Sequence, residues 1–224
     1  MQVGRLGFLA APSSCFRHGT VMRNTLVDVR ELLSRKGMNP SPGDLRGLRA
    51  LDLFQRDVND EDLRILSALE NLEFLSLAST RVSDAGLGRL IGLTRLKELH
   101  LDDTAISDEG LPDVARLETL ETLDLKGTMV TDDGLVLLAP LVTLKHLYLA
   151  DMAISNAGLR HLKAFPDLEM VVPWNDRITD AGLSHLHGSR NLKRLVLWGT
   201  NVTKSGVSSL LERFPRCDID HEST

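Results

Sequence analysis

Leucine recurs along most of the chain with a period of 24 residues. In each unit, the positions 3, 5, 10, 15, 18 and 21 residues after this leucine are also apolar. Only Pro173, Ser189 and Arg213 break this rule. A fixed period of this length is the signature of a solenoid, in which each unit buries its apolar face by stacking on its neighbours. The seven leucines that set the period are Leu48, Leu72, Leu96, Leu120, Leu144, Leu168 and Leu192.

Each unit begins with the spacing L-x-x-L-x-L, which predicts a short strand with alternate side chains facing the core. A turn follows, and then a Ser, Thr or Asn that can cap the start of a helix. An acidic residue usually comes next, where it would face the positive end of the helix dipole. Two residues later, a glycine is expected to let the helix lie close to an adjacent backbone. The caps are Asn59, Ser83, Ser107, Thr131, Ser155, Thr179 and Thr203.

Strand, turn and short helix in every unit predict an α/β solenoid, with parallel strands on the concave face and short helices on the convex face. The segment (S/T)-D-x-G-L, present at residues 83–87 and 179–183, resembles the leucine-rich-repeat family. More narrowly, it is similar to the cysteine-containing-type repeats of F-box substrate adaptors and of bacterial repeat proteins. The resemblance covers residues 48 to about 219. It implies a horseshoe-shaped leucine-rich-repeat solenoid, a fold that mostly binds proteins.

The residues before the repeats divide into two parts. Residues 1–20 are expected to be disordered or to form a targeting segment, because the first 27 residues hold no acidic side chain and only a short apolar stretch. Residues 21–47 predict an N-terminal cap, with an amphipathic helix over residues 21–36 that ends before Gly37. The apolar positions at helical spacing are Met22, Leu26, Val29 and Leu33.

The repeats occupy residues 48–214, and residues 215–224 predict a C-terminal cap strand and tail. A solenoid has to cover the apolar face of its last unit. Cys217 and Ile219 are therefore expected to tuck under the last repeat, and residues 220–224 to form a polar tail.

Composition narrows the classes of function. Apolar residues make up 42% of the chain and charged residues 25%, which suits a globular protein with a core. The formal net charge of −5 disfavours nucleic acid as a partner. No run approaches the ~20 apolar residues of a membrane span. Cys15 and Cys217 have neither metal-ligand spacing nor a disulfide framework, so free thiols and a cytoplasmic location are expected, although the acid-free N-terminus leaves targeting open.

The variable positions between the strand leucines should face away from the core, on the concave side of the sheet. The only tyrosine and both tryptophans of the chain fall on such positions, in three consecutive repeats. Exposed aromatic side chains beside Met and Arg are typical of a binding hot spot. We therefore predict a protein-binding patch; a homodimer contact, or cover by a loop or tail, are the alternatives. The binding patch consists of Tyr148, Met170, Val172, Trp174, Arg194, Val196 and Trp198.

A polar strip occupies the same positions in the middle repeats. His100 and Asp124 should be neighbours on adjacent strands, as in a weak metal site or an acid–base pair. No nucleophile accompanies them, and an open sheet offers no deep pocket. A hydrated strip that sets the charge preference for a partner is favoured, and neither metal nor cofactor is predicted. The specificity strip consists of Glu98, His100, Asp102, Asp124, Lys126 and His146.

Pro173 replaces a core leucine beside Trp174 and removes a backbone donor from a central strand, so a local irregularity is predicted at residues 171–176. The function that the sequence favours is non-catalytic protein–protein recognition through the concave face. One alternative is a substrate-receptor subunit of an enzyme complex, such as a ubiquitin-ligase adaptor, which would need residues 1–47 for docking. The other is a structural homodimer joined through the aromatic patch.

Overall fold

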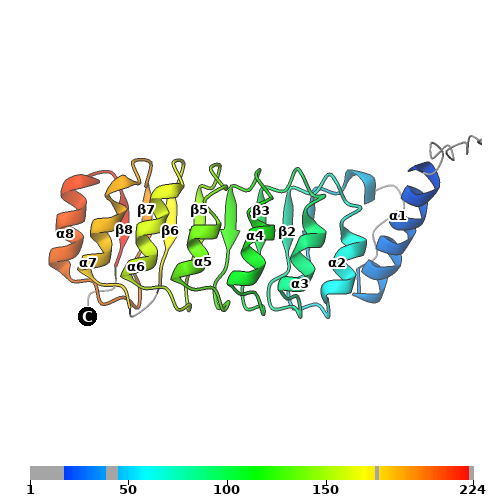
Figure 1. The fold of residues 1–224 in the computed structure, drawn as a ribbon, viewed down its shortest axis with the longest axis horizontal. Coiled ribbons are helices and arrows are strands. Elements are labelled where there is room, and N and C mark those ends of the chain that lie inside the picture. Colours follow the sequence, from blue (N-terminus) through cyan, green and yellow to red (C-terminus); the bar gives the residue numbers. More distant parts are fainter. Residues whose placement is uncertain (1–17, 39–44, 175–176, 222–224) are drawn as a thin grey trace, which may run out of the picture.

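The computed structural model describes residues 18–38, 45–174 and 177–221, with side chains from Leu26 onward. Across these residues the chain forms an open α/β solenoid, as predicted. Eight parallel strands form one sheet in their order along the chain, and helices line the other side (Figure 1). The strands are β1 (Ala50–Asp52), β2 (Phe74–Ser76), β3 (Glu98–His100), β4 (Thr122–Asp124), β5 (His146–Tyr148), β6 (Met170–Val172), β7 (Arg194–Val196) and β8 (Asp218–Asp220).

The helices are short because a 24-residue unit must also hold a strand and two connections. Several consist of one α-helical turn that continues as a 3-10 helix. The α-helices are α1 (His18–Arg35), α2 (Asp60–Leu66), α3 (Asp84–Leu87), α4 (Leu111–Val114), α5 (Asp132–Leu137), α6 (Asn156–Leu159), α7 (Asp180–Leu183) and α8 (Lys204–Arg213). The 3-10 helices are η1 (Leu45–Gly47), η2 (Gly88–Leu90), η3 (Asp108–Gly110), η4 (Arg160–Ala164) and η5 (Ser184–Gly188).

In-register pairing of the strands stacks the repeat leucines into ladders. Leu75, Leu99 and Leu123 are register partners on consecutive strands, and each is 0% exposed. The buried apolar side chains form one cluster that runs from Val29 in α1 to Cys217 beside β8. Each unit therefore completes its core only through its neighbours, as a solenoid requires.

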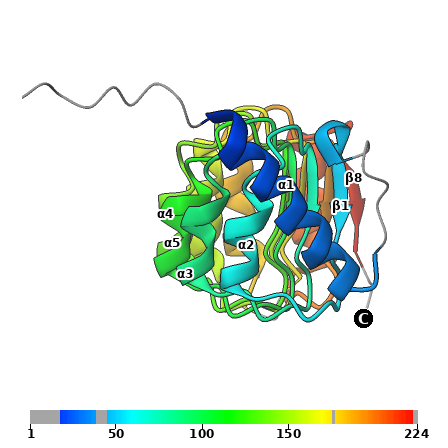
Figure 2. The ribbon, with the colours of Figure 1, turned by 90° about the vertical axis from the view of Figure 1, so that its right-hand side faces the viewer.

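Helix α1 lies across the N-terminal end of the solenoid (Figures 1 and 2). Its residues Val29, Leu32 and Leu33 are buried in the core cluster. The helix begins at His18, so residues 18–20 belong to it and not, as predicted, to a separate N-terminal segment. The rest of that prediction, for residues 1–17, lies outside the described residues.

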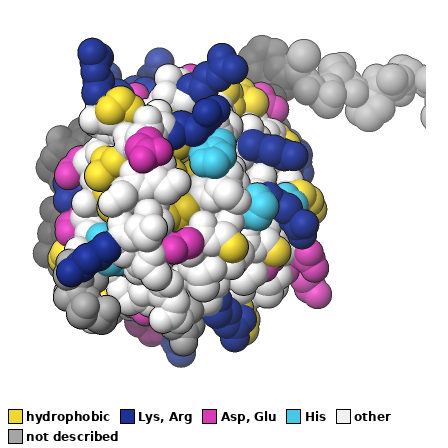
Figure 3. Space-filling model, turned by 90° about the vertical axis from the view of Figure 1, so that its left-hand side faces the viewer, with side chains coloured by type: hydrophobic (Ala, Val, Ile, Leu, Met, Phe, Trp, Pro, Cys, Tyr) yellow, Lys and Arg dark blue, Asp and Glu magenta, His cyan; other side chains and the backbone are white. Residues whose placement is uncertain are grey.

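Strand β8 covers the C-terminal end, where it pairs with β7 over all three of its residues. Phe214 and Cys217 are buried, and Ile219 packs against the core cluster. Asp220 is the register partner of Val196, so the prediction of a polar tail from residue 220 was wrong for this residue. Figure 3 shows this end of the molecule, where exposed hydrophobic side chains are scattered and do not form a continuous face.

The acidic residue after each helix cap joins consecutive repeats. The Asp84 carboxylate accepts the backbone N–H of Ser107 at 2.9 Å and the Ser107 hydroxyl at 2.6 Å. The same double hydrogen bond links Asp60, Asp108, Asp132 and Asp180 to the cap one repeat later. The sequence analysis assigned these acids only an interaction with the helix dipole. Their additional role is to hold the next repeat in register.

These hydrogen bonds between each acid and the next helix cap also explain the repeated glycine. A Cβ on Gly110 would overlap the carboxylate of Asp84, and a Cβ on Gly158 would overlap that of Asp132. The close neighbour of the glycine is therefore a side chain of the preceding repeat, and not the backbone that the sequence analysis expected. The (S/T)-D-x-G-L segment thus encodes one inter-repeat contact: the cap donates, the acid accepts, and the glycine leaves room for the acid.

The predicted irregularity lies at Pro173, which is buried directly after β6. Strands β6 and β7 pair over only two residues, whereas every other neighbouring pair of strands matches three. One repeat earlier, Leu149 donates its N–H to the Val172 carbonyl at 2.9 Å. Proline has no N–H and cannot donate the equivalent bond to Val196. Residues 175–176 lie outside the described residues.

Candidate binding face of the sheet

The predicted binding patch lies on the concave face of the sheet, over β5, β6 and β7. Register pairing places Tyr148 beside Val172 and Met170 beside Arg194. Tyr148, Met170 and Val172 are partly buried, while Arg194 is exposed. Burial, with the charge of Asp124 as a second cause, raises the pKa of the Tyr148 phenol, which therefore stays neutral at physiological pH. The register of the strands thus brings apolar and aromatic side chains together beside the charged Arg194.

Trp174 and Trp198 form the most prominent feature of this patch. Their side chains are 40% and 36% exposed, and the rings meet edge to face with centroids 6.1 Å apart. The Trp198 indole N–H donates to Asp220 Oδ1 at 2.8 Å. The Trp174 ring packs so closely on Gly199 that a Cβ there would overlap it. The two rings are thus held in place while much of their surface remains open to solvent.

The terminal strand adds two acidic side chains that the sequence analysis did not assign to the site. Arg194 Nε lies 3.8 Å from Asp218 Oδ2, and Arg194 Nη2 lies 3.9 Å from Asp220 Oδ2. Asp220 therefore neighbours both Arg194 and Trp198 at the C-terminal edge of the patch. The signal was present in the sequence, because the alternation Cys217-Asp218-Ile219-Asp220 continues the strand pattern of the repeats in register.

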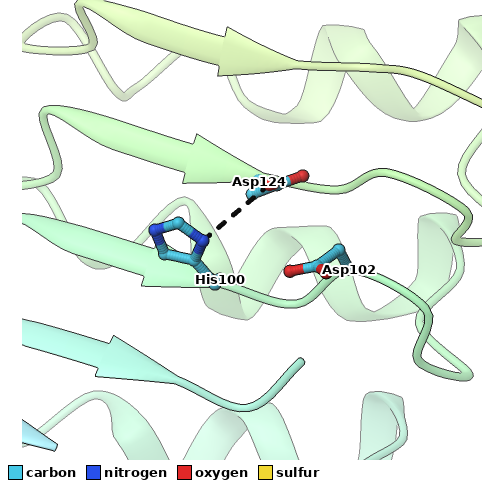
Figure 4. Close-up of side chains that lie close together, drawn as sticks. All are labelled: His100, Asp102 and Asp124. Atoms are coloured by element: carbon cyan, nitrogen blue, oxygen red, sulfur yellow. Dashed lines mark ion pairs between the residues drawn. The ribbon is translucent and has the colours of Figure 1, made fainter. Parts of the chain in front are cut away.

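The polar strip contains a compact cluster centred on His100. His100 and Asp124 are register partners on β3 and β4, as predicted, with His100 Nδ1 3.8 Å from Asp124 Oδ2 (Figure 4). On the other side of the ring, His100 Nε2 lies 2.8 Å from Glu98 Oε1. Asp102 follows β3 on the same face, and one ligand atom from each of His100, Asp102 and Asp124 lies within 4.8 Å of the others.

Negative charge dominates this cluster. Burial raises the pKa of the Asp124 carboxyl above its ordinary value, and the charge of Asp102 adds to this effect. Burial is also the first cause of the raised pKa of Asp102. Desolvation disfavours the charged form of a carboxyl group. Burial therefore outweighs the favourable effects of the backbone hydrogen bonds and of the His100 and Lys126 charges on the pKa of both carboxyl groups.

Lys126 and His146 belong to the predicted strip but have other partners. Lys126 Nζ lies 3.6 Å from Asp151 Oδ2, and its charge also acts on Asp102 and Asp124. His146 Nδ1 lies 3.1 Å from the hydroxyl of the buried Thr122. Glu98, His100, Asp102 and Asp124 lie together in the compact cluster, while His146 contacts Thr122 and Lys126 has a further partner in Asp151. The role of the strip in specificity stays a prediction.

An aromatic contact at the N-terminal side of the sheet was not assigned to the site. The Phe74 ring lies 5.4 Å from the His100 ring, centroid to centroid, and Phe54 is 49% exposed. The repeat positions of both residues had placed them on the concave face. Phe74 thus contacts the His100 ring at the edge of the cluster.

A ladder of alternating charges borders the face where the strands begin. Glu73 pairs with Arg49 at 2.7 Å and with Lys97 at 3.2 Å. The same pattern pairs Lys145 with Glu121 and Lys193 with Glu169. A hollow of about 330 Å³ lies against the Arg49–Lys97 end of this ladder, and another of about 200 Å³ lies between α7 and α8. Neither hollow is lined by the His100 cluster or the tryptophan pair.

The repeat pattern, the parallel sheet and the helical outer layer define a leucine-rich-repeat protein. Residues 93–112 and 116–139 match the family described as Leucine Rich repeat. Among solved structures, the chain is similar to internalin C2 from Listeria monocytogenes, with a TM-score of 0.60 and 21% sequence identity. That similarity covers 88% of this chain and 92% of that chain. At this identity it concerns the fold alone. A comparison with curated proteins finds no match.

These findings support the leucine-rich-repeat assignment and give no support to the narrower resemblance to F-box adaptors. Within the described residues, no helix combines the length and apolar character needed to cross a membrane. Cys217 is a buried free thiol, and burial raises its pKa to about 11. It is therefore a core residue and not a reactive nucleophile.

Proposed function

We propose that this protein is a non-catalytic recognition module that binds a protein partner across the concave face of its sheet. The observation that carries this proposal is the tryptophan pair, Trp174 and Trp198, exposed side by side over β6 and β7. The leucine-rich-repeat fold supports a protein as partner. The fold does not by itself fix a function, so the argument depends on the face.

The composition of the face is that of an interface hot spot. Tryptophan, tyrosine and arginine dominate such hot spots, and the two aromatic residues bury a large area at a small cost in side-chain entropy. The contacts of Trp174 with Gly199 and of Trp198 with Asp220 hold the rings before any partner binds. Preorganisation of this kind lowers the entropic cost of association. The acidic cluster around His100 would favour a partner with basic groups facing β3 and β4.

The test is affinity capture from a lysate of the source organism, with three forms of the full chain. These are the wild type, Trp174→Ala/Trp198→Ala, and the control Val136→Ala/Val142→Ala, which removes exposed apolar groups elsewhere. We expect a protein that binds the wild type and the control but not the tryptophan variant. Titration of that purified protein against the same three forms then measures the loss of affinity. Identical capture by all three forms would remove the aromatic patch as the binding site.

The two alternatives make different predictions. A structural homodimer joined through the patch would sediment as a dimer in the wild type and as a monomer in the tryptophan variant, without any partner. A substrate-receptor subunit would lose its complex when residues 1–47 are deleted, while the tryptophan variant retained docking.

We infer a cytoplasmic location from the buried free thiol of Cys217, which is consistent with a reducing compartment.

A further inference from the structure

The His100 cluster has the arrangement of a metal site. Two of its members, His100 and Asp102, come from one strand and the turn that follows it, and Asp124 is the register partner of His100 on the next strand. One ligand atom from each lies within 4.8 Å of the others, and the three side chains lie together over the carboxyl ends of β3 and β4 (Figure 4). Strand pairing fixes the spacing of His100 and Asp124, and Asp102 follows His100 by two residues.

The hydrogen bonds around the cluster leave one ligand atom of His100 and one of Asp124 facing each other. Glu98 Oε1 lies 2.8 Å from His100 Nε2. An ionised carboxylate can only accept, so this contact favours the tautomer with its proton on Nε2 and its lone pair on Nδ1. Asp124 Oδ1 accepts the backbone N–H of Lys126 at 2.9 Å, which leaves Oδ2 toward the ring. A carboxylate that accepts the far N–H of an imidazole is the usual partner of a metal-bound histidine. Glu98 is thus a positioning residue for His100.

The distance between those two atoms suits a shared ion better than a direct bond. His100 Nδ1 and Asp124 Oδ2 are 3.8 Å apart, which is too long for a hydrogen bond. A tetrahedral zinc ion at about 2.1 Å from each ligand atom would hold them roughly 3.4 Å apart. A side-chain adjustment of a few tenths of an ångström closes this difference. A divalent cation would also balance the two neighbouring carboxylates of Asp102 and Asp124.

We propose that His100, Asp102 and Asp124 form a binding site for a divalent transition-metal ion, with zinc as the best-suited metal. One imidazole nitrogen and two carboxylate oxygens are a mixed set that zinc and its neighbours accept, whereas magnesium and calcium prefer oxygen alone. Three protein ligands leave a fourth position open toward solvent. The metal alone is the ligand of this site, so its binding can be measured without the proposed protein partner.

The experiment is equilibrium zinc binding to the untagged full chain after treatment with a chelator, measured by competition with a chromogenic chelator. The matched variants are His100→Gln, Asp124→Asn and Glu98→Gln, and the control is His146→Gln on the neighbouring strand. We expect one zinc ion per wild-type chain. Loss of a ligand in His100→Gln or Asp124→Asn should weaken binding at least tenfold, and Glu98→Gln should weaken it roughly tenfold. His146→Gln should bind as the wild type does.

Thermal unfolding separates loss of the site from loss of the fold. The metal-free variants should melt close to the metal-free wild type, and zinc should raise the melting temperature only where the site is intact. Absence of zinc binding by the wild type would overturn the proposal. Equal binding by the wild type and His100→Gln would also overturn it, because the ion would then sit on other groups. Partner capture is not a readout here, so either proposal can fail without the other.

Discussion

The carboxylate of Asp132 holds Ser155, the helix cap of the next repeat, through two hydrogen bonds. One comes from the Ser155 backbone N–H at 2.8 Å and the other from its hydroxyl at 2.6 Å. One repeat later, Asn156 takes the place of the acid. It accepts the Thr179 N–H at 2.9 Å and donates its own amide N–H to the Thr179 hydroxyl oxygen at 2.8 Å. The contact therefore depends on geometry more than on charge.

This relationship predicts different effects for two substitutions at one position. Asp132→Ala removes both acceptors and leaves the part-buried N–H of Ser155 without a partner, which should destabilise the fold by about 2 kcal/mol. Asp132→Asn should keep both bonds by the Asn156 arrangement and cost less than about 1 kcal/mol. Urea unfolding followed by circular dichroism measures both. Equal losses in the two variants would show that the negative charge itself is needed.

The repeat glycine can be tested at Gly158, which faces Asp132. In a helix, Gly→Ala ordinarily stabilises by roughly 0.5–1 kcal/mol. Here the added Cβ would overlap the Asp132 carboxylate, so Gly158→Ala should instead destabilise by about 2 kcal/mol. Gly92→Ala, in a turn outside the helices, is the control, because its Cβ would lie 3.6 Å from the nearest atom, an ordinary contact. A stable Gly158→Ala protein would mean that the Asp132 carboxylate can move aside at little cost in free energy.

The contact of Asp180 with Thr203, the last of these inter-repeat contacts along the chain, predicts a dependence of stability on pH. Hydrogen bonds from Thr203, first from its side chain and then from its backbone, lower the pKa of the Asp180 carboxyl in the folded protein. A folded-state pKa below the unfolded value adds stability above the unfolded pKa. That stability is lost as pH falls through the folded pKa. The wild type should therefore lose more stability on acidification than Asp180→Asn does. Urea midpoints of the two proteins, measured from neutral to strongly acidic pH, check this.

Much of the fold could be predicted because a 24-residue period converts sequence positions directly into register. Leucine positions fixed the core, and alternation placed Trp174 and Trp198 on the open face. The Asp132–Ser155 contact was missed because each cap was interpreted within its own helix, whereas the acid bonds across to the next unit. The ion pair of Lys126 with Asp151 depends on the direction of a long side chain, which the period does not determine.

Pro173 provides a prediction at the one irregular junction of the sheet. Pro173→Leu restores the repeat leucine and an N–H that can donate to the Val196 carbonyl, as Leu149 donates to Val172. We expect a gain of about 1 kcal/mol in the free energy of unfolding. Leu149→Pro creates the same defect one repeat earlier and should cost about 2 kcal/mol or more. A less stable Pro173→Leu protein would show that the proline shapes the turn that carries Trp174.

Trp198 allows the roles of its ring and its N–H to be separated. Trp198→Ala removes a ring that is 36% exposed, so the melting temperature should change little, while affinity for a captured partner should fall by about 2 kcal/mol or more. Trp198→Phe keeps an aromatic ring but loses the hydrogen bond to Asp220. It should retain part of the affinity if ring area dominates.

Titration of the purified partner and thermal unfolding measure these two effects in the same samples. The edge-to-face contact of Trp174 with Trp198 supplies a structural check, because coupling between the two indoles should give a far-ultraviolet circular dichroism signal that both variants lose. A large fall in melting temperature for Trp198→Ala would make the ring a part of the C-terminal cap. In that case Trp198 holds β8 through Asp220, and the binding surface has to lie closer to Tyr148 and Met170.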